Sequence, residues 1–486
     1  MWISDDAHMG SIGDTALLEK VTTFVILLYT TSKNSKYICM SRLMISVAGI
    51  RGIVGETLTP EIAAMYARTF SAFLPEGTIV IGRDSRTSGP MLQEAVCAEL
   101  IAAGRKVYDI GIVPTPTVEI MVKHLQAVGG IIISASHNPA EWNALKLLNA
   151  QGLFLSAEEG KRFHALAKEE TEHSSPGGGE VVQQEGALDV HIQDILAISY
   201  LPVEAIKQKG FRVALDAVHG AGGAIGKTLL AQLGCTADIL YEEPTGAFPH
   251  NPEPTPEHLT ALQEQMQRGS YNVGFAFDPD VDRLALLDEN GTPLGEEMTL
   301  ALAARFVLAH RPGAVVTNLS TSAMIEAVAA DYKVPLFRTP VGEANVVGRM
   351  LAEKASIGGE GHGGVILPEV HAGRDAPLGV ALILALMTET GKPLSQLAQE
   401  LPQLEMIKER TPAPEGFAIA PFLDALTTAF AGYTRNTEDG VRFSKDGEWI
   451  HIRPSGTEPI IRYIAEASEK KRAQMLIAEA HRVIGA

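Results

Sequence analysis

Apolar runs and amphipathic segments alternate along the chain, and one order of elements occurs three times: strand, polar loop, helix, strand. Short apolar runs separated by amphipathic helices are typical of layered α/β domains. The pattern therefore predicts three similar α/β domains. Their elements are predicted at 78–81, from about Pro90 and at 106–109; at 212–215, 229–233 and 237–240; and at 314–316, 324–330 and 334–337.

Two segments between and after these repeats differ from them in composition. Residues 169–186 are rich in Glu, Ser, Gly and Gln, which predicts an exposed insertion. Residues 402–416 carry several prolines and charges, which predicts a linker. A smaller C-terminal domain follows, with a strand and turn predicted at 440–448 and a closing helix from about Lys470.

The first part of the chain does not fit the α/β pattern. Residues 21–29 are apolar, but a run of this length is too short to span a membrane. A basic start and a small-residue cleavage site, which a signal peptide requires, are not apparent. We therefore expect residues 1–43 to be a disordered extension without a role in function.

The bulk composition limits the classes of protein to consider. A chain of 486 residues is too long for one hydrophobic core and predicts three or four domains. The formal net charge of −18 argues against nucleic acid or an anionic membrane as a partner. Cys39, Cys97 and Cys235 show no metal-binding or CxxC spacing, which favours a reducing, cytoplasmic compartment. The oligomeric state is left open.

The segment Ser134-Ala-Ser-His-Asn-Pro139, called the serine loop below, follows the apolar run at 131–133. Pro139 prevents that predicted strand from continuing, and ligands bind α/β proteins where strands end. Ser136 is therefore a candidate phosphate carrier. Neighbouring side chains in an extended loop diverge, so a Ser136–His137 nucleophile and base pair is not favoured. Taken alone, the loop is also typical of an ordinary turn.

A second segment, Asp278-Pro-Asp-Val-Asp-Arg283, is called the metal loop below and follows the predicted strand at 273–277. Three alternating carboxylates repel one another unless a hard divalent cation such as Mg²⁺ binds their oxygens. Glu289 stands at the twelfth position, as in a calcium-binding EF-hand. That interpretation fails because Arg283 occupies the position that needs glycine, and 284–287 has the pattern of a strand.

A third segment, Arg453-Pro-Ser-Gly-Thr-Glu-Pro459, is called the anion loop below, and Arg462 follows it. Small residues let backbone N–H groups approach an anion, and an arginine binds phosphate through two hydrogen bonds. A phosphate carrier, a metal site and a separate anion site together suit phosphoryl transfer on a substrate that already bears a phosphate.

With these motifs the chain resembles the α-D-phosphohexomutases, the superfamily of phosphoglucomutase, phosphomannomutase and phosphoglucosamine mutase. The resemblance runs from about Met44 to the C-terminus. Besides the three loops, it rests on Gly49-Ile-Arg-Gly52, Gly82-Arg-Asp84, Thr339-Pro-Val-Gly342 and Gly359-Glu-Gly-His362.

The resemblance implies three layered α/β/α domains and a smaller α+β domain of TATA-binding-protein-like fold around a central cleft. We expect the extension at 1–43, domain I with the serine loop at 44–195, domain II with the metal loop at 196–295, domain III with a sugar-binding loop at 296–403, and domain IV with the anion loop at 404–486.

The resemblance also implies how the site works. Ser136 would arrive phosphorylated, donate its phosphoryl group to the sugar, and take back the other phosphate of the resulting hexose bisphosphate. Mg²⁺ would be held by Asp278, Asp280, Asp282 and a phosphate oxygen on Ser136. Catalytic roles are expected for Ser136, His137, Lys146 and Arg51, with the choice of His137 or Lys146 as acid/base left open. Substrate binding is expected at Arg283, Gly342, Glu343, Glu360, His362, Arg453, Ser455, Gly456, Thr457 and Arg462.

The substrate within this superfamily is less closely specified. Many phosphomannomutase/phosphoglucomutase relatives have Glu-x-Ser-Gly-His in the sugar-binding loop, whereas here the run is Glu360-Gly-His-Gly-Gly364. The wording Ile-Ser-Ala-Ser-His-Asn-Pro at 133–139 is similar to phosphoglucosamine mutases. We therefore expect conversion of glucosamine 6-phosphate to glucosamine 1-phosphate. A phosphomannomutase/phosphoglucomutase of mixed specificity is the first alternative, and a non-catalytic phosphosugar-binding protein or a phosphatase is a more distant one.

Overall fold

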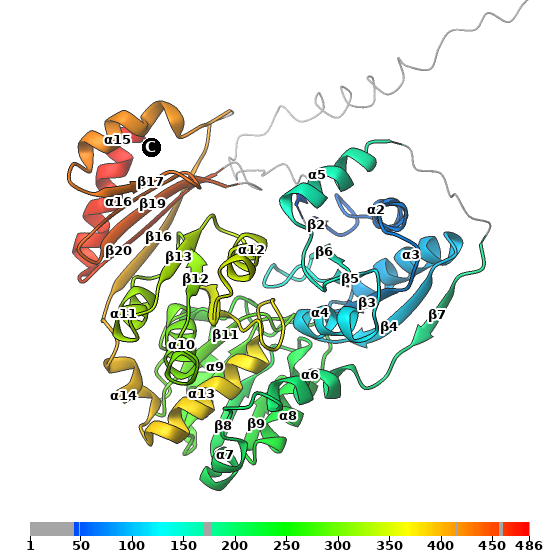
Figure 1. The fold of residues 1–486 in the computed structure, drawn as a ribbon, viewed down its shortest axis with the longest axis horizontal. Coiled ribbons are helices and arrows are strands. Elements are labelled where there is room, and N and C mark those ends of the chain that lie inside the picture. Colours follow the sequence, from blue (N-terminus) through cyan, green and yellow to red (C-terminus); the bar gives the residue numbers. More distant parts are fainter. Residues whose placement is uncertain (1–42, 48, 170–176, 415, 456–459, 486) are drawn as a thin grey trace, which may run out of the picture. The chain divides into compact units, whose positions relative to one another are not determined.

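A computed structural model describes residues 43–47, 49–169, 177–414, 416–455 and 460–485. Within this part of the chain, four β-sheets follow one another in sequence order (Figure 1). The extension predicted at 1–43 lies outside the described residues except for Leu43.

The first sheet is mixed, with β3, β4, β5 and β7 parallel and the remaining pairs antiparallel. Alternate residues of its central strands face opposite sides, and both sides are apolar: Ile79 and Ile81 pack toward α2 and α3, while Val80 packs toward α4. The sheet order is β1 (Met44–Ser46), β2 (Gly49–Ile53), β6 (Trp142–Asn149), β5 (Gly129–Ile133), β3 (Ile79–Arg83), β4 (Lys106–Ile112) and β7 (Glu180–Gln183). The helices are α2 (Pro60–Phe73), α3 (Gly89–Ala102), α4 (Thr115–His124), α5 (Ala157–Leu166) and α6 (Ala187–Leu196).

The second and third sheets share one plan: three parallel strands and an antiparallel edge strand. The second is β11 (Leu284–Leu287), β10 (Val273–Phe277), β8 (Arg212–Asp216) and β9 (Thr236–Leu240), with α7 (Val203–Lys209), α8 (Gly222–Gln232) and α9 (Thr260–Arg268). The third is β13 (Leu336–Thr339), β12 (Val315–Asn318), β14 (Ile357–Glu360) and β15 (Gly364–Ile366), with α10 (Glu297–His310), α11 (Met324–Asp331), α12 (Glu343–Glu353), α13 (Ala376–Thr390) and α14 (Leu394–Gln399).

A continuous apolar core joins the second and third sheets. In α13 every residue from Ala376 to Thr388 is buried, because this helix is apolar on all sides. Its Leu382 and Leu384 belong to the same cluster as Phe275 of the second sheet and Val315 of the third. The metal loop and the sugar-binding loop are therefore carried by elements that pack on one core.

The fourth sheet is antiparallel, and α16 packs against β16, β19 and β20. Its order is β16 (Glu405–Pro412), β20 (Ile460–Ala467), β19 (Glu448–Pro454), β18 (Val441–Lys445) and β17 (Thr434–Asn436), with α15 (Leu423–Ala429) and α16 (Lys470–Ile484). The closing helix begins at Lys470, as the sequence predicts. The four sheets confirm the predicted class of three α/β units and a smaller α+β unit.

The prediction of a linker at 402–416 is wrong. The segment at 169–186, predicted to be an exposed insertion, is largely exposed where it is described, and it contains the edge strand β7, which extends the first sheet by pairing with β4. The linker predicted at 402–416 is largely β16, whose backbone pairs with β20 along its whole length. In both cases hydrogen bonds to a distant strand order a segment whose composition is typical of loops.

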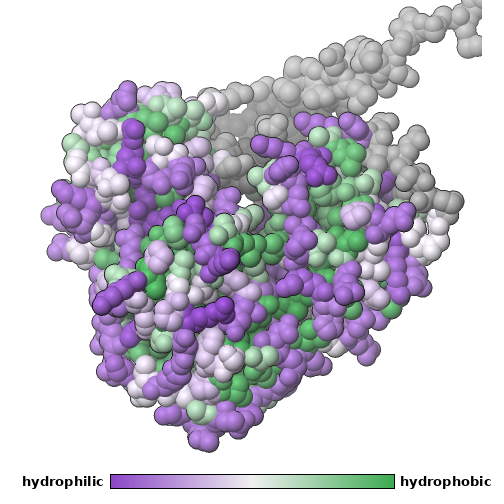
Figure 2. Space-filling model, viewed as in Figure 1, coloured by the Kyte–Doolittle hydropathy of each residue, from purple (hydrophilic) through white to green (hydrophobic). Residues whose placement is uncertain are grey.

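The chemical motifs lie where strands end. The serine loop follows β5, the metal loop follows β10, and Glu360 is the last residue of β14. Polar side chains cover most of the face drawn in Figure 2, and the apolar ones form interrupted patches. No helix in the described part of the chain has the length and apolar character needed to cross a membrane.

Candidate active site

The serine loop holds Ser136 in an unusual conformation. Its backbone has a φ of 52°, in the left-handed region that non-glycine residues seldom adopt. The Ser136 N–H donates to Ser134 Oγ at 2.9 Å, and Ser134 Oγ donates to Asp84 Oδ2 at 2.7 Å. The Ser136 hydroxyl, 3% exposed, donates to Asp278 Oδ2 at 2.7 Å. The turn therefore aims the hydroxyl of Ser136 at the metal loop.

Arg86, which follows β3, forms hydrogen bonds with the backbone of the serine loop. Its side chain is buried and forms an ion pair with Asp84 at 3.0 Å. The guanidinium also donates to four backbone carbonyl groups, those of Ser136 (2.5 Å), Asn138 (2.6 Å), Pro139 (2.6 Å) and Trp142 (3.0 Å). A planar guanidinium has enough fixed donors to make all of these contacts at once. Arg86 thereby determines the path of the serine loop.

In the metal loop, donors of the protein hold one carboxylate oxygen of Asp280 and of Asp282, and both oxygens of Asp278, whose Oδ2 accepts from Ser136. These bonds fix the rotation of the three carboxylates and orient the other oxygen of Asp280 and of Asp282. The donors are the N–H groups of Asp282 and Arg283 for Asp278 Oδ1 (3.1 and 3.2 Å), Lys146 Nζ and Thr115 Oγ1 for Asp280 Oδ2 (2.5 and 2.6 Å), and Arg374 Nη2 for Asp282 Oδ2 (2.6 Å).

The second oxygens of these aspartates suit a metal ion. Asp280 Oδ1 and Asp282 Oδ1 are buried without a hydrogen-bond partner, and the three carboxylates offer ligand atoms within 4.8 Å of one another. Burial and the neighbouring charges of Asp282 and Asp280 raise the pKa of Asp278 well above its usual range. A hard cation with oxygen ligands removes both the repulsion and the cost of unpaired buried oxygens. The residues present therefore fit a divalent cation.

Lys146 of β6 lies against the same carboxylates. Its ammonium is 2.5 Å from Asp280 Oδ2 and 3.8 Å from Asp282 Oδ2. Burial alone would lower the pKa of Lys146, but the Asp280 and Asp282 charges outweigh it and raise that pKa. Asp280 responds in the opposite direction, because Lys146 holds the pKa of its buried carboxyl below the usual range. Lys146 is thus a cation fixed at the edge of the metal loop.

Arg51 and His137 also contact residues of the serine loop. Arg51 Nη1 donates to Asn138 Oδ1 at 2.6 Å. His137 Nδ1 is 3.4 Å from Ser136 Oγ, and its Nε2 is 3.9 Å from Glu253 Oε1. Burial, together with the nearby charges of Arg283 and Arg51, lowers the pKa of His137 well below its usual range. Ser136 donates to Asp278 rather than to a histidine paired with an acid, so these distances do not form a Ser-His-acid triad.

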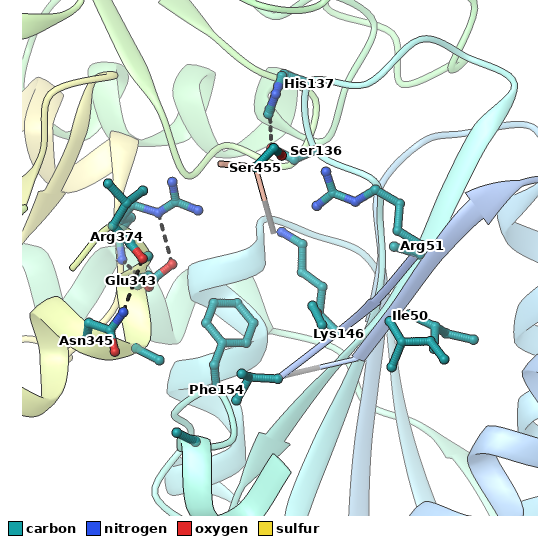
Figure 3. Close-up of a pocket in the computed structure, with 18 of the residues that line it drawn as sticks. Ile50, Arg51, Ser136, His137, Lys146, Phe154, Glu343, Asn345, Arg374 and Ser455 are labelled. Carbon is teal, nitrogen blue, oxygen red and sulfur yellow. Dashed lines mark hydrogen bonds and ion pairs between the residues drawn. The ribbon is translucent and has the colours of Figure 1, made fainter. Parts of the chain in front are cut away.

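A cavity of about 680 Å³ opens beside these groups (Figure 3). Most of the site residues predicted from the sequence line this cavity. They come from several parts of the chain that are far apart in sequence. In Figure 3 the side chains of Arg51 and Lys146 point into the cavity from the first sheet, and Arg374 faces them across the space. The predicted catalytic and substrate-binding residues that line the cavity are Arg51, Ser136, His137, Lys146, Arg283, Gly342, Glu343, Arg453, Ser455 and Arg462.

Two carboxylates from the elements of the third sheet and its helices, those of Glu343 and Glu360, differ in their access to the cavity. Glu343 lines it and accepts two hydrogen bonds from Arg374. Glu360 lies behind, 2% exposed, and accepts from Asn318, from the Gly342 N–H and from His362 Nε2. Burial would raise the pKa of Glu360, but His362 and other donors hold it below its usual range. Among the described residues, Glu343 rather than Glu360 or His362 reaches the cavity surface.

The anion loop is described only in part. Arg453 lines the cavity and its Nε donates to Asp439 Oδ1 at 3.0 Å. Ser455 and Arg462 also line it. The expected ligands Gly456 and Thr457 lie outside the described residues.

Sequence reasoning missed Arg86, Thr115 and Arg374. Arg86 stands in the polar run after the first repeat's opening strand, and an arginine two residues after Asp84 is the one signal for it. Thr115 and Arg374 lie far from the metal loop in sequence, yet they donate hydrogen bonds to Asp280 Oδ2 and Asp282 Oδ2. Local patterns carry no signal for such contacts.

The fold is that of an α/β protein, and the site brings a serine hydroxyl and three carboxylates that could hold a metal ion to the wall of one cavity. Family comparison agrees. Residues 42–174, 189–291 and 295–404 match the alpha/beta/alpha domains I, II and III of phosphoglucomutase/phosphomannomutase, and residues 412–482 match its C-terminal domain. The chain belongs to the phosphoglucomutase/phosphomannomutase family. It is a phosphohexomutase, an isomerase that interconverts hexose 6-phosphate and hexose 1-phosphate.

Individual relatives cover nearly the whole chain. A probable phosphoglucosamine mutase of Methanopyrus kandleri is 35% identical, covering 88% of this chain and 95% of its own. A phosphoglucomutase/phosphomannomutase of Thermococcus kodakarensis is 36% identical with the same coverage, 88% and 95%. A crystal structure of a putative phosphomannomutase from Thermus thermophilus has a TM-score of 0.78 at 26% identity, covering 91% of this chain and 99% of that one.

Proposed function

We propose that this phosphohexomutase acts on glucosamine phosphate in preference to glucose or mannose phosphate, through a phosphorylated Ser136 and a hexose bisphosphate intermediate. The observation that carries the mechanism is the Ser136 hydroxyl, 2.7 Å from Asp278 and at the wall of the cavity. The names of similar relatives support the substrate: the Methanopyrus kandleri relative and others at 30–32% identity are probable phosphoglucosamine mutases.

Each half-reaction moves one phosphoryl group and needs no co-substrate. In the first, the bond from phosphorus to Ser136 Oγ breaks, and phosphorus bonds to the free hydroxyl oxygen of the hexose monophosphate. The hydroxyl proton passes to a base, and Ser136 Oγ keeps the bonding electron pair. In the second, the other phosphate of the bisphosphate returns to Ser136 Oγ, and the sugar oxygen that it leaves takes up a proton. The sum is an isomerisation, with the serine phosphorylated again.

The proposed metal ligands are Asp278, Asp280 and Asp282, with a phosphate oxygen on Ser136. An all-oxygen site of carboxylates favours Mg²⁺. When bound, the ion offsets negative charge on the phosphoryl group in transit. Lys146, fixed on Asp280, would contribute positive charge on the same side.

Proton transfer is proposed for the groups around the reacting oxygen. His137 Nδ1 lies 3.4 Å from Ser136 Oγ, whereas the Lys146 ammonium is engaged by two carboxylates. This geometry supports His137 as the group that exchanges the proton and Lys146 as an electrostatic partner. Arg51 lies beside both and would contact the transferring phosphate, because a guanidinium binds phosphate through paired hydrogen bonds.

The distal phosphate is proposed to bind Arg453, Ser455 and Arg462 on the cavity wall, together with Gly456 and Thr457. The bisphosphate must turn end over end between half-reactions, so this part of the cavity has to accept either phosphate. Closure of the cavity around the substrate would exclude water, which otherwise hydrolyses the phosphoserine. Arg283 lines the same cavity and adds positive charge near the metal loop.

The amino group is proposed to be recognised by a carboxylate. An amino sugar is cationic at C2, and Glu343 is the carboxylate that reaches the cavity surface, with Glu360 and His362 behind it. Discrimination through one such contact amounts to about 1–3 kcal/mol, or roughly 10- to 200-fold. We therefore expect measurable activity on glucose and mannose phosphates as well.

The deciding experiment compares kcat/KM for the 1-phosphates of glucosamine, glucose and mannose, with and without added hexose 1,6-bisphosphate. The proposal predicts the highest value for glucosamine 1-phosphate and stimulation by the bisphosphate. A mannose preference would overturn the amino-sugar assignment and leave the mutase standing. It would favour the mixed-specificity alternative.

The serine is tested separately. Purified protein should carry phosphate on Ser136 in a fraction of molecules, which peptide mass analysis detects. Ser136→Ala should fold normally and lose most turnover. Near-normal activity of Ser136→Ala would contradict the phosphoserine mechanism, and binding of phosphosugar without turnover in the unsubstituted protein would favour the non-catalytic alternative.

For the cellular setting we propose the cytoplasm. Cys97 and Cys235 are free, as thiols are in a reducing compartment. A phosphosugar is the only partner that the proposal requires.

A further inference from the structure

Arg374 and Asp375 stand together between β15 and α13, and their side chains make separate sets of contacts. Arg374 lines the active-site cavity (Figure 3). Asp375 caps α13, since its Oδ1 accepts from the Leu378 N–H at 2.9 Å. The pair thus joins the cavity wall to the start of a fully buried helix.

The guanidinium of Arg374 reaches three separate parts of the site. Its Nη2 donates to Asp282 Oδ2 of the metal loop at 2.6 Å, and its Nε donates to Glu343 Oε2 of α12 at 2.9 Å. Its Nη1 lies 3.4 Å from Glu360 Oε2 and 3.2 Å from His362 Nε2 of the sugar-binding loop. Burial opposes the charge, but the carboxylates of Asp282, Glu343 and Glu360 raise the pKa of Arg374 well above its usual range.

The loop that carries Arg374 is fixed from behind by a buried cluster of Glu119, His191, His371 and Asp375. Asp375 Oδ2 accepts from His191 Nε2 at 2.8 Å and from His371 Nε2 at 3.1 Å, and His371 Nδ1 is 3.2 Å from Glu119 Oε2. Each of these side chains is at most 3% exposed. Glu119 belongs to α4 and His191 to α6, so the cluster fastens the loop to helices of the first sheet unit.

Gly373 shows how closely the loop fits this cluster. A Cβ atom at this position would lie 1.8 Å from Glu119 Oε2 and 2.9 Å from His371 Cε1. No side chain fits there without moving the cluster. The backbone before Arg374 is therefore held against Glu119, and the guanidinium projects into the cavity from a fixed base.

The contacts of Arg374 have a consequence for the metal site. Arg374 donates to Asp282 Oδ2. The other carboxylate oxygen of this residue, Asp282 Oδ1, is therefore the one without a hydrogen-bond partner. Glu343, which would meet the sugar, shares the same guanidinium. Any movement of Glu343 on sugar binding is thus transmitted to Asp282 through one rigid, planar group. A lysine has a single ammonium and cannot make the three contacts together.

We propose that Arg374 is a positioning residue that couples phosphosugar binding at Glu343 and Glu360 to metal binding at Asp282. The inference rests on the proposed roles of the metal loop and the sugar-binding loop. By reciprocity, the metal should tighten phosphosugar binding by the same factor by which the sugar tightens metal binding.

The test measures this coupling directly, by titration calorimetry, in a Ser136→Ala background that cannot turn over. The dissociation constant of glucosamine 6-phosphate is measured in saturating Mg²⁺ and in EDTA. A coupling of ordinary size gives a ratio of about 5- to 150-fold. Adding Arg374→Gln or Arg374→Lys should bring the ratio to within about twofold of one, since neither side chain bridges Asp282 and Glu343.

Arg305→Gln is the matched control. Arg305 also pairs with a carboxylate, Glu400 at 2.8 Å, and donates to the Leu397 carbonyl at 3.2 Å, away from the cavity. It should keep the parental ratio. If Arg374→Gln does not fold by circular dichroism, Glu343→Gln replaces it, because that change removes the sugar-side partner and leaves the Asp282 contact; it too should lose the coupling.

The results separate this proposal from the function on which it rests. A parental ratio near one, or an unchanged ratio in Arg374→Gln and Arg374→Lys, overturns the coupling while phosphosugar binding itself stands. If the Ser136→Ala protein binds neither glucosamine 6-phosphate nor mannose 6-phosphate, the proposed substrate fails and the coupling fails with it.

Discussion

Replacing Arg86 by methionine should displace the serine loop without replacing any residue expected to meet substrate. Arg86 is 1% exposed, and its guanidinium contacts Asp84, three backbone carbonyl groups of the loop and that of Trp142. Methionine has a similar length but no donors. Asp84 would then be left buried and charged without its partner.

The magnitude follows from this unpaired charge. Burial raises the pKa of Asp84, and Arg86 is the first group that opposes the shift. Removing one partner of a buried ion pair costs about 3–5 kcal/mol, mostly because the remaining charge is uncompensated. Movement of Ser136 by about 1 Å would lower kcat by roughly 10²-fold. Asp84→Asn in the Arg86→Met protein should recover part of the stability, because it removes that charge.

Native-state hydrogen exchange measures the effect where it occurs, on the amides of β3, which leads to Arg86, and of β5, which leads to the serine loop. Arg105→Met is the matched control. Arg105 donates to the backbone carbonyls of Ser71, Leu74, Pro75 and Gly77 in the same sheet unit, without a buried carboxylate partner. It should cost less stability and leave kcat unchanged.

Two results would refute this reasoning. A loss below about 1 kcal/mol in Arg86→Met would mean that the buried ion pair does not hold the loop. Equal effects of Arg86→Met and Arg105→Met on kcat would mean that general destabilisation, rather than the position of Ser136, controls the rate.

Three further predictions follow from the site, the buried cluster and the N-terminus. Asp280→Asn should raise the Mg²⁺ concentration for half-maximal activity by about 10- to 100-fold, and an unchanged metal dependence would make the metal loop a structural turn. Burial alone would lower the pKa of His371. The carboxylates of Asp375 and Glu119 outweigh burial, so that this pKa is raised from 6.5 to about 10. The stability that His371 contributes is therefore complete below pH 6.5 and is lost as the pH rises toward 10, by at most about 1.4 kcal/mol per pH unit. In urea unfolding, the stability difference between the parent protein and His371→Gln should shrink over that range, and a constant difference would contradict the assignment. Deletion of 1–43 should leave kcat and KM unchanged, and a large loss of activity would show that the extension is functional.

The sequence alone was sufficient to predict the α/β repeats and the three chemical loops. Strands such as β10 and β11 are short, wholly apolar runs next to polar turns, so local burial determines them. Asp278, Asp280 and Asp282 also lie within one loop, where alternate spacing suffices to bring their carboxylates together. The family resemblance placed Ser136 beside them, and its hydroxyl lies 2.7 Å from Asp278.

Composition misled where distant backbone pairing decides the structure. The segment around β16 has the prolines and charges of a linker, yet β20, about fifty positions later in the chain, supplies its hydrogen bonds. β7 likewise pairs with a distant strand, β4. Such pairing depends on partners that no local pattern contains.

Only the tertiary structure decided which oxygens of Asp280 and Asp282 lack a hydrogen-bond partner, which carboxylate reaches the cavity, and what holds the serine loop. The Oδ2 atoms of Asp280 and Asp282 accept hydrogen bonds from Thr115, Lys146 and Arg374, which lie 92 to 165 residues away in the sequence. Glu343 meets the cavity, whereas Glu360 is surrounded by donors. These properties arise from the packing of separate sheets around one space, and packing is set by the whole chain rather than by its local periods.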